Sequence, residues 1–337
     1  MRKLYLITGG TGHLGQTVIR KLIRDRAGSI RALVLPGDRT KLPKEVETIF
    51  GDVCDPASLP PFFNTDGYEE TVLLHLAAII TIASKPNPML WRVNVEGTRN
   101  VMGMALERLI GRVVYVSSVH AIPEQPLPGR ITEASHFTAD SVIGQYAKSK
   151  AAAAEIVLDF ARRGLNVSIV HPSGILGPGD TLKSNHLTRT VQAMASGRMP
   201  FSIAGGYDFV DVRDVAQGIL QCEAKGRAGE CYILSGHYVS VSGLTRIISG
   251  FTGRKFLPLH IPRFALRFFA LLGEKLAVLF SRSPLLTPYS LSTLQANALF
   301  SCRKAARELG YRVRPLRMTV KNVLHSLGYG NKAKSSQ

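Results

Sequence analysis

Residues 8–15 read TGGTGHLG, which places four glycines in eight residues. They follow the apolar run 3–8 and precede the amphipathic run 14–25. A glycine-rich turn between a strand and a helix lets backbone N–H groups approach a phosphate closely. Gly9, Gly12 and Gly15 are three residues apart, unlike the two-then-three spacing of the common dinucleotide fingerprint. This feature predicts a strand, a tight turn and a helix, and the rest of the chain must indicate the ligand.

Strand-like and helix-like segments alternate along the N-terminal half. Strands are expected at 3–8, 29–35, 46–52, 71–78, 112–118 and 166–172, and helices at 14–25, 91–109 and 145–163. Continuous apolar strands separated by helices predict an α/β fold, a Rossmann-type doubly wound parallel sheet covered on both faces. In such sheets ligands bind beyond the carboxyl ends of the strands, where the glycine-rich turn lies.

The less regular C-terminal half predicts a second, smaller part of the protein. We expect a nucleotide-binding core over 1–180 with a returning segment near 205–235, a substrate-binding lobe over mainly 181–330, and a disordered tail at 331–337. The apolar stretch 257–290 is interrupted by charges such as Arg263 and Glu274, so it does not predict a membrane span. It predicts a helix of the substrate lobe or, alternatively, a helix that lies on a membrane surface.

Composition narrows the class of protein. The four cysteines of this 337-residue chain are scattered, which favours a reducing compartment and disfavours a metal site or a disulfide framework. No long apolar stretch precedes the glycine-rich turn, so we expect a cytoplasmic protein with possible membrane association through 257–290. The net charge of +18 comes without a nucleic-acid motif, so it predicts a solvated basic surface and no nucleic-acid partner.

Further motifs follow the glycine-rich turn in order. They are GDV (51–53), LHLAA (74–78), VNVEGT (93–98), YVSS (115–118), YAKSK (146–150), HPSGILGPGD (171–180) and DFVDVRDVA (208–216). With these motifs the sequence resembles the extended short-chain dehydrogenase/reductase family, also called the NAD-dependent epimerase/dehydratase family, over residues 3–325. The stretches 171–180, 257–290 and 298–316 resemble its dihydroflavonol reductase-like and 3β-hydroxysteroid dehydrogenase-like members.

Tyr146 and Lys150 are four residues apart, so they lie on one face of the predicted helix. A phenol with its ordinary pKa of about 10 is a poor base at neutral pH, and a neighbouring ammonium would lower that pKa. Tyr146 could then exchange a proton with a substrate oxygen while hydride moves at carbon. The resemblance adds Ser118, which would hold that oxygen, and Asn94, which would take part in a proton relay.

The resemblance also implies a binding site for NAD or NADP along the strand ends. The implied residues are Thr8, Gly9, Gly12, His13, Leu14, Gly15, Arg39, Asp52, Val53, Leu76, Ala77, Ala78, Tyr146, Lys150, Pro172, Ser173, Gly174 and Ile175. An acidic residue at the end of the second strand would select NAD, and a nearby arginine would select NADP. Leu35 stands at that position, Asp38 could serve NAD, and Arg39 or Lys41 could serve NADP. The missing carboxylate at Leu35 favours tolerance of NADP.

Departures from the family pattern bear on the reaction. Val119 and His120 stand where the dehydratases carry Asp-Glu, and Tyr207 stands where the sugar-nucleotide epimerases carry an arginine. These departures favour an oxidoreductase that interconverts a secondary alcohol and a ketone on a small apolar ring substrate. A nucleotide-sugar 4-epimerase and a non-catalytic NAD(P)-sensing protein are the alternatives. The family habit also implies a homodimer.

Four other residues are predicted to be structural. We interpret His75 and His171 as packed, hydrogen-bonded histidines, so that no metal site is expected. Asp211 and Asp214 match a family segment and are expected to have structural roles.

Overall fold

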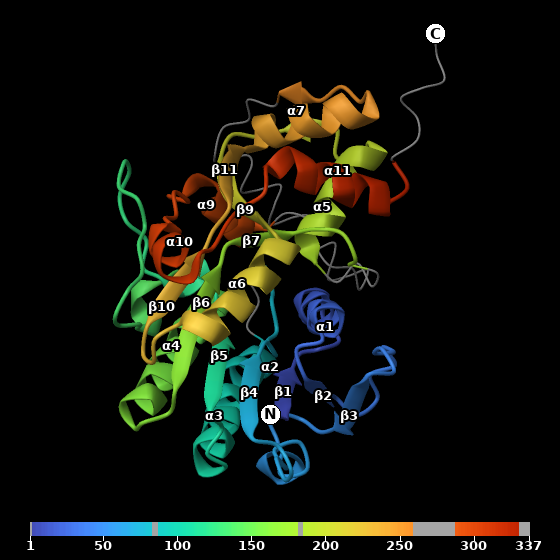
Figure 1. The fold of residues 1–337 in the computed structure, drawn as a ribbon. Coiled ribbons are helices and arrows are strands. Elements are labelled where there is room, and N and C mark those ends of the chain that lie inside the picture. The colour runs from blue at the N-terminus through green and yellow to red at the C-terminus, as the bar shows by residue number, and fades with distance from the viewer. Residues whose placement is uncertain (1, 83–86, 181–184, 259–286, 330–337) are drawn as a thin grey trace.

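The computed structural model describes residues 2–82, 87–180, 185–258 and 287–329. Its centre is a parallel sheet of seven strands in the order β10-β6-β5-β4-β1-β2-β3. The strands are β1 (Lys3–Thr8), β2 (Ser29–Val34), β3 (Val46–Phe50), β4 (Glu70–His75), β5 (Arg112–Val116), β6 (Val167–Pro172) and β10 (Cys231–Leu234). The predicted doubly wound parallel sheet is therefore confirmed (Figure 1).

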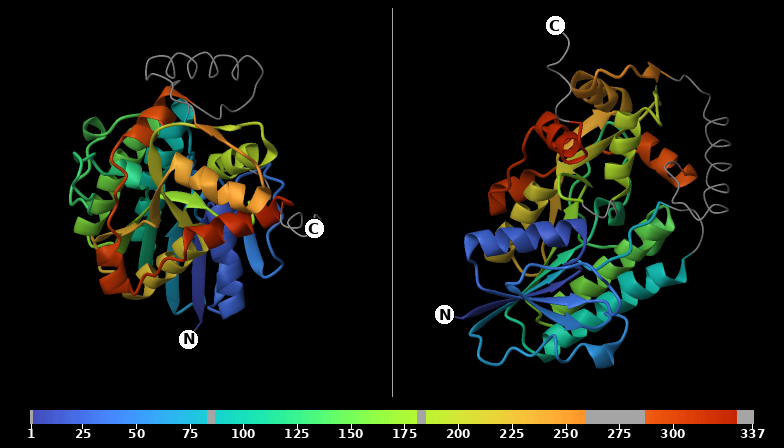
Figure 2. Two further views of the ribbon diagram at one scale, coloured as in Figure 1. Left: turned by 90° about the horizontal axis from the view of Figure 1, so that it is seen from above. Right: turned by 90° about the vertical axis from the view of Figure 1, so that its right-hand side faces the viewer.

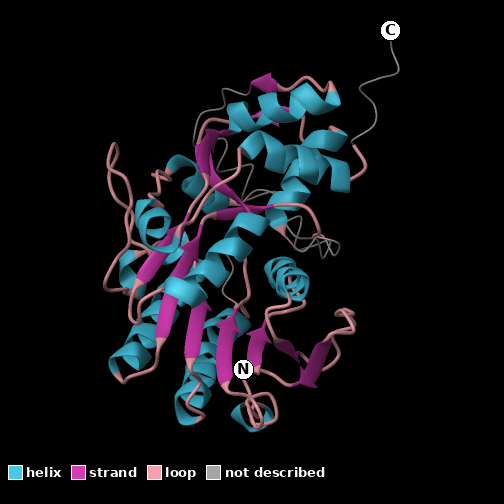
Figure 3. Cartoon of the chain, viewed as in Figure 1, coloured by secondary structure: helices cyan, strands magenta, loops and turns pink. Residues whose placement is uncertain are grey.

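Helices cover both faces of this sheet (Figures 2 and 3). One face is covered by α1 (His13–Asp25) and α6 (Val212–Lys225), with α10 (Arg303–Leu309) beside α6. The opposite face is covered by α3 (Thr98–Glu107) and α4 (Gln145–Arg162). Successive side chains of a strand point to opposite faces. Leu4 and Leu6 accordingly pack toward α3 and α4, whereas Tyr5 and Ile7 pack toward α1 and α6.

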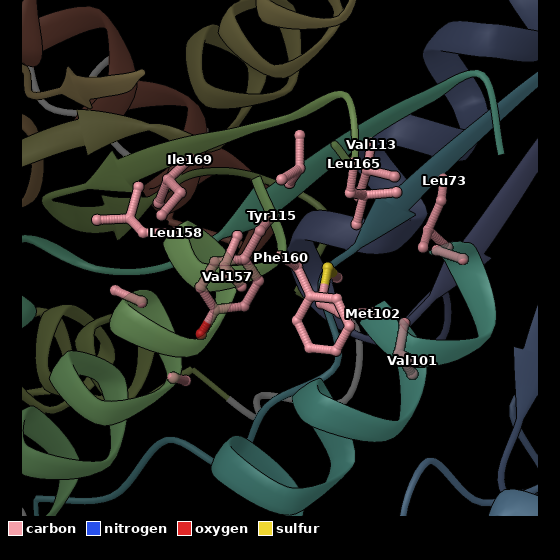
Figure 4. Packing of buried hydrophobic residues seen from close by; sticks show 14 of the residues in the cluster. Leu73, Val101, Met102, Val113, Tyr115, Val157, Leu158, Phe160, Leu165 and Ile169 are labelled. Carbon is pink, nitrogen blue, oxygen red and sulfur yellow. The ribbon is translucent and has the colours of Figure 1, made fainter. Parts of the chain in front are cut away.

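The cluster beneath α3 and α4 is built from large apolar side chains (Figure 4). Val101 and Met102 of α3 and Phe160 of α4 pack against Leu73 and Tyr115 of the sheet, and all five are buried. Burial of this kind contributes about 25 cal/mol per Å² of apolar surface. It fixes α4, the helix that carries Tyr146 and Lys150, against the strands.

A second group of elements lies beyond the carboxyl ends of the main sheet (Figure 1). Its helices are α5 (His186–Ser196), α7 (Val241–Thr252), α9 (Pro288–Gln295) and α11 (Leu316–Ser326). Its strands are β7 (Gly174–Leu176), β9 (Gly206–Asp211) and β11 (His237–Ser240) in one sheet, and β8 (Phe201–Ser202) and β12 (Leu257–Pro258) in another. A third apolar cluster holds this group together.

The helix predicted over 91–109 is present from 88 to 107, but it is not α-helical throughout. The chain forms α2 (Pro88–Trp91), a π-helical segment η2 (Arg92–Gly97) and then α3. Tertiary contacts override the local pattern here. Asn94 hydrogen-bonds Ile79, and Gly97 lies so close to Val53 that an added Cβ would be 2.7 Å from its Cγ2 atom. Such π-helical turns are rare and frequently occur at functional sites.

Four predicted strands end earlier than expected. Those predicted over 29–35, 46–52, 71–78 and 112–118 end at Val34, Phe50, His75 and Val116. The residues that follow leave the sheet as loops at its carboxyl edge. Short 3₁₀ turns lie in these segments, η1 (Pro56–Ser58) after β3, and η3 (Val119–Ala121) and η4 (Ala139–Ser141) between β5 and α4. The strand β10 was not predicted.

Most of the apolar stretch 257–290 lies outside the described residues, as does the predicted tail 331–337. Within the part of the chain that the structure describes, no helix combines the length and the apolar character needed to span a bilayer. All four cysteines are free thiols.

Candidate active site

The glycine-rich turn joins β1 to α1 and packs against the loop after β4. Gly9 has a φ of +70°, and an added Cβ would be 2.7 Å from the backbone nitrogen of Ala77. A Cβ on Gly15 would collide with the carbonyl oxygen of Gly9. Gly12 is the N-cap residue of α1, and no side chain caps the first N–H groups of that helix. The turn therefore fits the diphosphate of a dinucleotide, which helix N-termini of this kind bind.

A buried hydrogen-bond chain connects this turn with the π-helical segment. The Thr98 hydroxyl donates to the carbonyl of Asn94 at 2.7 Å, so it accepts from His75 Nε2–H at 3.1 Å. His75 Nδ1 then carries no proton and accepts from the Thr8 hydroxyl at 2.6 Å. Burial lowers the pKa of His75 to about 3. His75 is thus a neutral, packed histidine, as predicted.

The other predicted cofactor residues on this side lie along the same edge. Leu76 and Ala77 donate backbone N–H groups to the Thr8 carbonyl and hydroxyl, at 3.2 Å each, and Ala78 follows them. Asp52 and Val53 come directly after β3, and the Asp52 carboxylate accepts from the Cys54 N–H at 2.8 Å. His13 and Leu14 form the first turn of α1, and His13 Nε2 hydrogen-bonds the Pro178 carbonyl.

The loop after β2 contains the residues that could distinguish NAD from NADP. Leu35 is 55% exposed and Arg39 is exposed. The Asp38 carboxylate accepts a hydrogen bond from the Thr40 N–H at 2.8 Å, so it is held within its own loop. Burial opposes ionisation of Asp38, but hydrogen bonds from Thr40 and Thr11 outweigh it and lower the pKa.

Lys150 and Tyr146 lie on the first two turns of α4, and both are buried, with exposed fractions of 2% and 7%. The Lys150 amine donates to the Val116 carbonyl at 2.9 Å and to the Tyr115 hydroxyl at 3.4 Å. Ser118, just beyond β5, shares a side-chain hydrogen bond with Tyr146. The structure thus brings Ser118, Tyr146 and Lys150 together beside the carboxyl end of β5.

The pKa values in this group differ from the expectation. Burial raises the pKa of Tyr146 to about 12, with a smaller opposite effect from its hydrogen bond with Ser118. Burial lowers the pKa of Lys150 to about 7, because a charged amine is poorly solvated there. The predicted lowering of the Tyr146 pKa by the Lys150 ammonium is therefore wrong for the protein's own groups. At neutral pH the phenol keeps its proton and the amine is partly neutral.

Asn94 is buried, and its side-chain amide is hydrogen-bonded to the backbone of Ile79 and to Ser149. Its carbonyl oxygen accepts from the Ile79 N–H at 2.8 Å, and its amide donates to the Ile79 carbonyl and the Ser149 hydroxyl at 3.0 Å each. Ser149 in turn donates to the Tyr146 carbonyl at 2.8 Å. Asn94 thereby positions the backbone that carries Tyr146, and its role in a proton relay stays a prediction.

Pro172 ends β6, Ser173 connects it to β7, and Gly174 and Ile175 begin β7 beside the same strand ends. The Ser173 hydroxyl donates to the buried Asp208 carboxylate, which also accepts from the Gly236 N–H at 2.7 Å. His171, near the end of β6, stacks on Phe137, and its Nδ1–H donates to the Ser118 carbonyl at 3.0 Å. The prediction that His171 is a packed, hydrogen-bonded histidine is confirmed. Within the described ranges, no cluster of three or more His, Cys, Asp or Glu residues could hold a metal ion.

Sequence reasoning missed a cluster of aromatic side chains around Tyr146. His120 contacts the Tyr146 ring edge-on, with ring centroids 5.9 Å apart, and hydrogen-bonds the hydroxyls of Tyr207 and Tyr289. His120 and Tyr207 stood out in the sequence only as departures from the family pattern. No signal connected Tyr289 with them, because it lies 143 positions after Tyr146 in the chain.

The comparisons with known proteins agree with this geometry. The model of the "NAD dependent epimerase/dehydratase family" matches residues 5–235. The chain belongs to this family.

Relatives within the family are similar over nearly the full chain. A "Putative dihydroflavonol 4-reductase" of Synechocystis is 29% identical, covering 96% of this chain and 94% of the relative. The "Sterol demethylase protein B" of Methylococcus capsulatus is 33% identical, covering 90% and 92%. A "3beta-hydroxysteroid-dehydrogenase/decarboxylase isoform 1" of Arabidopsis thaliana is 26% identical, covering 96% and 79%. The crystal structure of gox2253 is 33% identical with a TM-score of 0.80, covering 98% of this chain and 99% of that one.

The predicted resemblance to the extended short-chain dehydrogenase/reductase family is therefore confirmed, including its dihydroflavonol reductase-like and 3β-hydroxysteroid dehydrogenase-like members. The chain is an NAD(P)-binding enzyme of this oxidoreductase family.

Proposed function

We propose that this enzyme interconverts a secondary alcohol and a ketone on a small, mainly apolar ring substrate, with Tyr146 as the acid/base. The observation that carries the proposal is the convergence of Ser118, Tyr146 and Lys150 at the carboxyl end of β5. A hydroxyl beside the phenol can hold a substrate oxygen within reach of the proton that Tyr146 donates or accepts.

NAD(P), when bound along the strand ends, would supply or accept the hydride. The chain's own groups determine where the proton is held. Burial keeps the pKa of Tyr146 at about 12, so its phenol is protonated at neutral pH and suited to donating a proton to a carbonyl oxygen under reduction. Lys150 lies one helical turn after Tyr146 and anchors α4 to β5 through its hydrogen bond to Val116. Its amine can be charged or neutral near pH 7. These features support the reductive direction.

The surroundings of Tyr146 favour an uncharged substrate over a sugar nucleotide. Tyr207, which replaces the epimerases' arginine, is 8% exposed and hydrogen-bonded to His120. Phe209 and Phe300 pack edge-on against its ring. A guanidinium that could bind a diphosphate is thus replaced by aromatic carbon and one hydroxyl. The names of these relatives, a dihydroflavonol reductase and sterol or steroid enzymes, support a ring substrate.

The loop after β2 supports use of NADP. Asp38 is held within its loop by Thr40, while Arg39 is exposed and Leu35 supplies no carboxylate for a ribose 2′-hydroxyl. An arginine in this loop can pair with a 2′-phosphate.

A spectrophotometric assay of NADPH and NADH oxidation with a panel of cyclic ketones tests the proposal. We expect net oxidation of the reduced cofactor with apolar ring ketones. An epimerase would convert a sugar nucleotide with no net change in cofactor, so UDP-glucose and UDP-galactose are included and their interconversion is measured by chromatography. Epimerisation without ketone reduction would contradict the proposal.

A further inference from the structure

Three polar aromatic side chains from distant parts of the chain meet beside Tyr146. His120 comes from η3, Tyr207 from β9 and Tyr289 from α9. His120 Nε2 is 2.9 Å from the Tyr207 hydroxyl, and its Nδ1 is 3.3 Å from the Tyr289 hydroxyl. The rings of His120 and Tyr207 are stacked, with centroids 5.8 Å apart. We call these three residues the His120 array.

The array packs against the start of the catalytic helix α4. The Tyr289 ring occupies the space where a side chain at Gly144 would be, because an added Cβ would collide with it. Gly144 precedes α4 directly and has a φ of +98°, which favours glycine. A negative charge on Tyr146 would raise the pKa of both Tyr207 and Tyr289, so the three phenols are close enough to interact.

The array is uncharged at neutral pH. Burial lowers the pKa of His120 to about 4, with a smaller effect from His186. Burial also raises the pKa of Tyr207 and of Tyr289. A neutral imidazole has one N–H donor and one acceptor nitrogen. One tyrosine must therefore donate its proton to His120, while the other accepts from His120 and keeps its own O–H proton for another partner.

We propose that the His120 array is a second polar contact for the substrate, which selects ring ketones and alcohols that carry another oxygen close to the reacting one. This inference rests on the proposed function, because Tyr146 must hold the reacting oxygen. The tyrosine hydroxyl that does not donate to His120 donates to the second oxygen. His120 is a positioning residue that fixes which hydroxyl points to the substrate. A ligand without the second oxygen lacks this contact, which costs affinity.

The test compares 1-tetralone with 2-hydroxy-1-tetralone, which differ by one hydroxyl on the carbon next to the carbonyl. Binding is measured as the shift in melting temperature of the enzyme with NADP+, and turnover is measured separately with NADPH. We expect kcat/KM of the natural enzyme to be about 10-fold higher for the hydroxyketone, mainly through KM. Binding of the hydroxyketone should also raise the melting temperature more than binding of 1-tetralone does.

The variants are Tyr207→Phe, Tyr289→Phe, His120→Phe and His120→Gln, with Tyr238→Phe on the exposed part of β11 as the control. The phenylalanine variant at His120 should lose the preference for the hydroxyketone while still reducing 1-tetralone. At least one of the two tyrosine variants should do the same. Glutamine retains one donor and one acceptor, so His120→Gln should recover part of the preference. The two tyrosine variants keep the test decisive if the histidine variants fold poorly.

The outcomes separate this inference from the proposed function. Turnover of both ketones with no dependence on the hydroxyl, or a dependence that all four variants retain, overturns the second contact alone. Hydroxyl-dependent binding that the variants abolish, without turnover, overturns the proposed reaction and leaves the contact standing. Neither binding nor turnover of either ketone overturns both.

Discussion

The Lys150 amine donates a hydrogen bond of 2.9 Å to the carbonyl of Val116, the last residue of β5. This bond ties the catalytic helix to the strand that ends beside Ser118. It also places a buried amine with a pKa of about 7 one turn from Tyr146. The Lys150 side chain thus both positions the catalytic helix and provides a group at the site that can be protonated or neutral.

Replacing this amine tests its role. Lys150→Met should lower kcat by about 10²- to 10⁴-fold, the range expected when a group that supports acid/base catalysis is lost. Its stability to urea at pH 7 should change little, because loss of the hydrogen bond to Val116 is offset by removal of an amine whose charged form is penalised by burial. Lys148→Met, on the same helix but with its side chain 40% exposed, is the matched control and should retain kcat. A Lys150→Met enzyme with nearly unchanged kcat would refute this role.

The glycine-rich turn gives a second prediction. Gly9→Ala should weaken NAD(P)H binding and lower the free energy of unfolding, because it adds a collision with Ala77 to a left-handed backbone that alone costs about 1–2 kcal/mol. Gly164→Ala, in the turn between α4 and β6, has a φ of +99° with open space around it, so it carries only the backbone cost. Cofactor titration by fluorescence compares the two variants. Equal affinities would show that the close approach at Gly9 does not shape the cofactor site.

Buried neutral histidines predict how stability depends on pH. Burial lowers the pKa to about 3 for His75 and about 4 for His120 and His171, below the ordinary 6.5. Below pH 6.5 the unfolded chain binds protons that the native state does not, so stability falls as pH drops from 6.5 toward 4. Each histidine contributes at most about 1.4 kcal/mol per pH unit. These three groups contribute no such dependence above this window.

Urea unfolding at pH 7, 6 and 5 measures this dependence. His75→Gln should reduce the slope of unfolding free energy against pH, whereas the exposed His325→Gln should leave it unchanged. An identical slope in the natural protein and His75→Gln would contradict the assignment of a neutral His75.

Much of this fold followed from the sequence because its signals are local. The strand from Lys3 to Thr8 and the helix that carries Tyr146 were predicted within one residue, since apolar periodicity and the glycine-rich turn define them. The π-helical turn at Asn94 was missed because it is formed by distant contacts with Ile79 and Val53. The meeting of His120 with Tyr289 likewise depends on tertiary packing.

Protonation was the least predictable property. Spacing placed Tyr146 beside Lys150, but the sequence could not show that both are buried deeply enough for desolvation to dominate the pKa of each group. Asp211 and Asp214 had the expected structural roles. Asp211 caps α6 and bonds Arg213 and Thr319, and Asp214 pairs with Arg314 at 2.7 Å.

Cofactor selectivity is predicted to depend on Arg39. Arg39→Ala should weaken NADPH binding about 10-fold or more and leave NADH binding nearly unchanged, because only NADPH carries the 2′-phosphate that a guanidinium pairs with. Arg26→Ala, an exposed change at the end of α1, controls for the loss of one positive charge. Fluorescence titration measures the dissociation constants of NADPH and NADH for each variant. Equal weakening of NADPH and NADH binding in Arg39→Ala would exclude selection by Arg39.

The most direct test of the central claim replaces one hydroxyl. Tyr146→Phe is compared with Tyr68→Phe, a change outside the site, for turnover of a ring ketone and for the dissociation constant of the reduced cofactor. We predict that Tyr146→Phe lowers kcat by about 10²-fold or more while cofactor affinity stays within a few-fold, and that Tyr68→Phe changes neither. Turnover by Tyr146→Phe at close to the natural rate would contradict the assignment of Tyr146 as the acid/base.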